Sequence, residues 1–117
     1  MNKGTLTNVQ MASIERLAAL AHMRQGAFAL AIETAQFGIH SGDEYERCLG
    51  SLIQSVSHGR MGRLDEANAV YRQALLAWPD ALTRRGCVVE ADHGVLVIKS
   101  AALLEDLKAE ADALLGT

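Results

Sequence analysis

Gly26 and Gly62 lie 36 positions apart and restrict the possible folds of this chain more than any other feature. Each separates two stretches whose apolar residues recur every three or four positions, and each is followed five positions later by an alanine, Ala31 or Ala67. Glycine tolerates the left-handed conformation in which many helices end, and a spacing of three and four marks one face of a helix. The sequence therefore predicts a repeated unit of two helices joined by a glycine turn, which buries its apolar face only by stacking on neighbouring units.

The apolar periodicity predicts helices over about residues 11–25, 27–39, 44–57, 64–78 and 100–115. Pro79 is expected to end the fourth helix, because the residue before a proline is pushed out of the helical conformation. A chain of 117 residues fits one domain. We therefore expect a flexible tail over residues 1–10 and a single all-α domain of five to six helices over residues 11–117. Five charged residues of the last helix are expected to face solvent: Glu105, Asp106, Lys108, Glu110 and Asp112.

The segment after Pro79 has two interpretations. Cys87-Val88-Val89 and Val95-Leu96-Val97-Ile98 flank the turn-like Asp92-His93-Gly94, which is typical of a β-hairpin. Gly94, however, lies 32 positions after Gly62, close to the period of the repeat. This spacing favours a helix over residues 81–93 as the start of a third unit, and the hairpin remains the alternative.

The repeated unit resembles the tetratricopeptide repeat (TPR), which has glycine in its turn, small and aromatic residues on its second helix and proline near its end. The residues that carry this resemblance, and would build the scaffold, are Gly26, Ala31, Gly62, Ala67, Tyr71, Ala74 and Pro79. In that family the first helix of each pair lines a concave groove. Carried over to this chain, the groove-lining positions are Arg16, Leu20, Met23, Arg24, Leu49, Leu52, Val56, Arg60, Arg84 and Val88. An apolar floor with arginines at its rim suits an amphipathic partner helix with acidic positions.

Residues 17–95 also resemble the small TPR chaperones of bacterial type III secretion systems, through the helix–turn–helix of Ser55 to Leu76 and through Trp78-Pro79, Ala81-Leu82 and Cys87. The resemblance implies a cytoplasmic chaperone, without enzymatic activity, that holds a needle subunit and prevents its premature polymerisation. It further implies a heterotrimer with a second, small helical co-chaperone. A general TPR adaptor for another peptide is the alternative.

Catalytic and cofactor chemistry finds little support in the residue spacing. No pair among His22, His40, His58 and His93 has the i, i+4 spacing of a metal-binding helix, so we expect neither a metal nor another cofactor. Cys48 and Cys87 form no CxxC motif, and a small thiol-dependent enzyme or sensor using Cys87 is the second alternative.

Charge and hydropathy bear on partners and location. The formal net charge of −3 argues against nucleic acid as the partner. No apolar run approaches the roughly 20 residues of a membrane span, and the N-terminus does not resemble a signal peptide. The expected location is therefore the bacterial cytoplasm.

Overall fold

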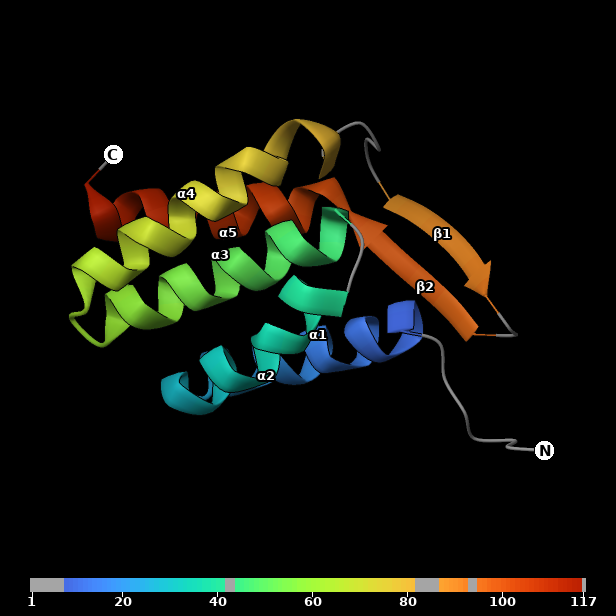
Figure 1. Cartoon of the computed structure of the whole chain (residues 1–117), viewed down its shortest axis with the longest axis horizontal. Helices are drawn as coiled ribbons and strands as arrows, with labels where there is room; N and C mark the ends of the chain where they lie inside the picture. The colour runs from blue at the N-terminus through green and yellow to red at the C-terminus, as the bar shows by residue number, and fades with distance from the viewer. Residues whose placement is uncertain (1–7, 42–43, 82–86, 93–94, 117) are drawn as a thin grey trace.

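The computed structural model describes residues 8–41, 44–81, 87–92 and 95–116, and within these it describes the side chains of residues 14–37, 39–40, 45–76 and 103–116. The described elements are five helices and one two-stranded sheet (Figure 1). In chain order they are α1 (Asn8–Arg24), α2 (Phe28–Ser41), α3 (Glu44–Arg60), α4 (Leu64–Ala81), β1 (Cys87–Asp92), β2 (Val95–Ser100) and α5 (Ala101–Leu115).

The predicted helices are present, but their ends differ from those predicted. α3 continues to Arg60, beyond its predicted end at residue 57. α1 begins at Asn8, inside the segment predicted as a tail, while residues 1–7 lie outside the described part of the chain. α4 continues to Ala81, so the prediction that Pro79 ends this helix is wrong. Proline removes its own backbone N–H, which costs one hydrogen bond. This loss falls in the last turn of α4, where the helix is about to end.

The α1–α2 and α3–α4 turns have the same backbone hydrogen bonds. The Ala27 N–H donates to the His22 carbonyl at 2.9 Å, and 36 positions later the Arg63 N–H donates to the His58 carbonyl at 2.9 Å. This six-to-one bond and the left-handed φ values of 83° at Gly26 and 79° at Gly62 define a Schellman turn. The predicted repeat of the glycine turn is therefore confirmed for these two helical pairs.

Helix α3 lies at the centre of the molecule, since α1, α2, α4 and α5 all pack against it. Its apolar side chains form the core with those of the surrounding helices. Three small or aromatic scaffold residues of α4 are buried there, as the repeat pattern predicts: Ala67, Tyr71 and Ala74. The core is thus built around the first helix of the second pair.

The helix predicted over residues 81–93 is wrong, because residues 87–92 form strand β1. This strand pairs antiparallel with β2, from Cys87 opposite Ser100 to Asp92 opposite Val95. The β-branched residues on both sides of a short turn favour this local pairing over a third helical pair. Gly94, the expected third turn glycine, lies outside the described residues. The all-α prediction is therefore correct for the five helices and needs this hairpin added.

Candidate functional site

Helix α5 covers the face of α3 on which sequence analysis places the partner groove. α5 packs against α3 more extensively than against α4, whereas α3 packs more extensively against α2 than against α1. α5 therefore does not repeat the position of α3 in the array. Figure 1 shows α5 running behind α3 and α4, in the same direction as α3. The chain's own last helix thus lies where a partner helix was expected.

The apolar positions predicted to line the groove meet in the core beside α5. Leu49, Leu52 and Val56 of α3 are completely buried, and so are Leu104 and Leu107 of α5. All five belong to one cluster of buried apolar residues. From α1, Met23 is buried in the same cluster, and Leu20 is partly buried against it. The structure therefore brings these predicted residues together, but they pack against α5 and do not line an open groove.

Two of the predicted arginines hold a carboxylate of α5. Arg24 Nη1 lies 2.9 Å from Glu110 Oε1, and Arg60 Nη2 lies 3.1 Å from Glu110 Oε2. The two arginines are 36 positions apart, so they are equivalent residues of the two helical pairs. The Glu110 side chain is only 19% exposed, so the expectation that it faces solvent is wrong.

A second set of polar contacts fixes α5 to α4. The Tyr71 hydroxyl donates a hydrogen bond to Asp112, and Lys108 Nζ lies 3.0 Å from the same carboxylate. Burial, and then the bond to Asp112, raise the pKa of Tyr71 above its ordinary value of 10. Asp112 therefore also faces a neighbouring helix, and the solvent-side expectation is wrong for it as well.

Arg16, a third predicted groove arginine, does not join this arrangement. Arg16 is buried between α1 and α3, with its Nε 3.4 Å from Glu46 Oε1 and its guanidinium 5.5 Å from the centre of the Tyr45 ring. Arg84 lies outside the described residues. Val88 is on β1, and its side chain is not among those described. Arg16 thus connects α1 to α3.

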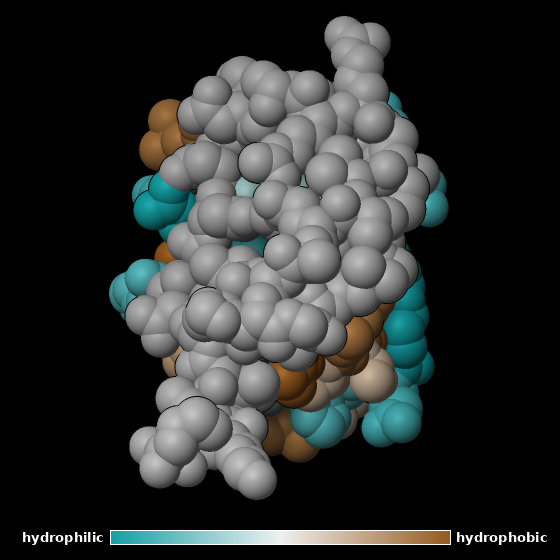
Figure 2. All heavy atoms as spheres, turned by 90° about the vertical axis from the view of Figure 1, so that its right-hand side faces the viewer, coloured by the Kyte–Doolittle hydropathy of each residue, from teal (hydrophilic) through white to brown (hydrophobic). Residues whose placement is uncertain are grey.

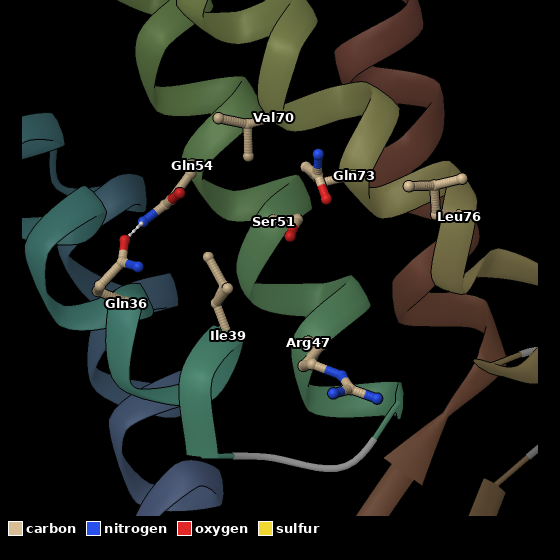
Figure 3. Close-up of a pocket in the computed structure, with 8 residues that line it drawn as sticks. All are labelled: Gln36, Ile39, Arg47, Ser51, Gln54, Val70, Gln73 and Leu76. Atoms are coloured by element: carbon tan, nitrogen blue, oxygen red, sulfur yellow. Dashed lines mark hydrogen bonds between the residues drawn. The ribbon is translucent and has the colours of Figure 1, made fainter.

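A groove of about 360 Å³ opens on the opposite side of α3, between α2 and α4 (Figure 3). At 3.6 residues per turn, its floor residues Ser51 and Gln54 point away from Leu52 and Val56. Gln54 Nε2 donates to Gln36 Oε1 at 2.8 Å and to the Ile32 carbonyl at 2.9 Å. The lining residues are Gln36, Ile39, Arg47, Ser51, Gln54, Val70, Gln73 and Leu76.

None of the predicted groove residues lines this second groove, although the sequence carries a signal for it. The residues of α3 that line it recur at three- and four-residue spacing, and they are polar although Ser51 and Gln54 are buried. A polar stripe on a helix that is otherwise buried indicates a face that no other helix covers.

The described side chains include neither a reactive thiol nor a cluster of metal-binding groups. Burial raises the pKa of the Cys48 thiol to about 12, and its Sγ donates to the Ala74 carbonyl at 3.5 Å. A thiol held protonated in this way is a poor nucleophile. The Cys87 side chain lies outside those described, and the described residues contain no cluster of three metal-binding side chains.

Comparisons with known proteins leave the family open. No protein-family model, curated protein or solved structure matches this chain. Among the described residues, no helix combines the length and apolar character needed to cross a membrane.

Proposed function

We propose that this chain is a TPR-like chaperone that holds the amphipathic helix of a partner on the face formed by α1 and α3. The observation that carries the proposal is the pairing of two repeat-equivalent arginines, Arg24 and Arg60, with a single helix carboxylate. Recognition of an amphipathic helix needs an apolar floor and charges that set its register. Leu49, Leu52 and Val56 supply the floor beside these arginines.

The proposed partner is the polymerising needle subunit of a type III secretion system. This part of the proposal rests on the resemblance of residues 17–95 to the needle-subunit chaperones. A subunit that polymerises through a helix exposes an apolar stripe, and covering this stripe keeps the subunit monomeric. The work of such a chaperone is binding in the cytoplasm, and it needs neither a catalytic group nor a cofactor.

The outer face of α1 is the proposed contact for a small helical co-chaperone. Ile14 and Leu17 are exposed there, one helical turn apart. Figure 2 shows hydrophobic side chains at the level of the molecule where α1 and α2 lie in Figure 1. The first helix of a repeat array needs a polar outer face or a covering partner, and this apolar pair favours a partner.

Co-expression with the products of the neighbouring genes tests the proposal. The chain is purified on a tag, and the companion proteins are identified by mass spectrometry. We expect a stoichiometric complex with a polymerising helical subunit and a second small helical protein.

Charge reversal then locates the contact. Arg24→Glu combined with Arg60→Glu is expected to abolish capture of the subunit, because both charges would repel an acidic helix. Arg72→Glu, an exposed arginine of α4, is the matched control and should retain the subunit. A tagged chain that purifies alone contradicts the proposal, and a stoichiometric partner unrelated to secretion supports the general TPR adaptor instead.

A further inference from the structure

We propose that α5 is an intramolecular placeholder, which a partner helix of the same pattern replaces on α3. The inference rests on the proposed function and adds two properties to it: the binding face is closed in the free chain, and α5 specifies the partner's sequence pattern. Its basis is that α5 makes both kinds of contact expected of a partner, apolar burial and a carboxylate between two arginines.

The contacts of α5 define the pattern. Leu104, Leu107 and Ala111 are completely buried, and they occupy positions i, i+3 and i+7 of the helix. Glu110, at i+6, is the residue held by Arg24 and Arg60. A competing helix therefore needs apolar residues at i, i+3 and i+7 and a carboxylate at i+6.

The arrangement of the helices indicates that α5 is separable from the rest. α1, α2, α3 and α4 form a continuous series in which each helix packs on the next, and α5 is not needed to link any two of them. α5 is placed against one side of α3, with a smaller contact to α4.

The ion pairs of Glu110, one of the two sets of polar contacts that hold α5, favour exchange rather than permanent attachment; the other set, the bond from Tyr71 to Asp112, has to break when α5 leaves. The Arg24 and Arg60 side chains are 53% and 48% exposed. Ion pairs of exposed side chains are weak and are screened by salt. An equivalent carboxylate from a partner would replace Glu110 without leaving a buried charge unpaired.

Native-state hydrogen exchange of the full chain tests whether α5 is releasable. We expect the amides of α5 to exchange about tenfold or more faster than those of α3, through an opening that leaves α1–α4 folded. If the amides of α5 and α3 exchange together, in a single global opening, α5 is an integral part of the core and the proposal is overturned.

Binding of the chain's own helix in trans provides the second test. The probe is a fluorescent synthetic peptide with the sequence of residues 101–116. In the full chain, Glu110→Lys replaces the two attractions to Arg24 and Arg60 by two repulsions, and it should raise the apparent affinity for the peptide about tenfold by populating the open state. The matched control is Glu105→Lys, the same charge change at an exposed position of α5.

Each outcome of the peptide test decides the proposal. Tighter binding to the Glu110→Lys chain than to the Glu105→Lys chain, with helical circular dichroism retained, supports it. Equal binding overturns it, and so does global unfolding of the Glu110→Lys chain, which would show that α1–α4 depend on α5. Both tests are made without a partner protein, so a positive result combined with a failed co-expression would reject the needle subunit and retain the placeholder.

Discussion

The pairs α1–α2 and α3–α4 share the same glycine turn, but equivalent residues of the two pairs are buried to different extents. Their glycine turns have the same hydrogen bonds at the same spacing. Leu17 of α1 is nevertheless 60% exposed, whereas Ile53, its equivalent 36 positions later in α3, is completely buried. The difference arises from neighbours, because α3 is enclosed by four helices and α1 is at the end of the array.

A repeat unit and the stacking of units therefore contribute different parts of the structure. The unit specifies the glycine turn and its hydrogen bonds. Stacking decides which apolar residues become core and which stay available to a partner. The exposed apolar residues of α1 thus mark a free end of the array.

The largest expected effect is the loss of stability on truncating Ile53, compared with truncating its equivalent, Leu17. Ile53→Ala should lower the free energy of unfolding by about 2–5 kcal/mol, through lost burial and the cavity left behind. Leu17→Ala should change it by less than about 0.5 kcal/mol, as for most surface positions. Urea denaturation measures both, and similar losses at the two positions would contradict the assignment of α1 as a free end.

The turn glycines should give equal effects, because their local structures are the same. Gly26→Ala and Gly62→Ala should each cost about 1–2 kcal/mol, since a Cβ disfavours the left-handed conformation. The space around each glycine is open, with no atom within 4 Å of an added Cβ, so backbone strain is the whole effect.

Asparagine provides the control for these turns. Gly62→Asn should cost less than Gly62→Ala in the same denaturation experiment, because asparagine tolerates the left-handed region better. A large difference between Gly26→Ala and Gly62→Ala would show that the two turns are not energetically equivalent.

The arginines of the two pairs provide a weaker test, since they share one carboxylate. Arg24→Ala and Arg60→Ala should each cost about 0.2–1 kcal/mol, less at high salt. The double variant should cost more than the sum, because each single change also removes repulsion between the two arginines. Denaturation at low and high salt checks this, with Arg72→Ala as control, and strict additivity would contradict a shared site.

Local signals in the sequence were sufficient for the helical pairs. The three- and four-residue spacing identified the helices, and the glycines at 36-residue spacing identified both turns. Burial of Ala67 and Ala74 also followed from the pattern, because small residues on the second helix permit close packing.

The hairpin and the position of α5 depend on information that the period of the repeat does not contain. Gly94 continued the period approximately, but the β-branched residues around it pair locally as strands. The apolar stripe of α5 was evident, yet a stripe does not specify which surface it will meet. The local pattern of α5 predicts a solvent position for Glu110, because it contains no information on Arg24 and Arg60, which are 86 and 50 positions away in the chain.

The smallest expected effect concerns His58, which occupies the position before Gly59 at the end of α3. Its Nδ1 is buried and has no hydrogen-bond partner among the described residues. Burial lowers the pKa of His58 below its ordinary value of 6.5; Arg63 lowers it further, and Glu66 opposes the shift. The unfolded chain therefore binds more protons than the folded chain as the pH falls through 6.5, and the free energy of unfolding should decrease there.

His58→Gln should reduce this pH dependence, measured by urea denaturation at a series of pH values between about 5 and 7. His22→Gln, at the equivalent position of the first pair, is the matched control for removing an imidazole beside the turn. An unchanged pH slope in His58→Gln would show that burial at the end of α3 does not penalise the charged imidazole.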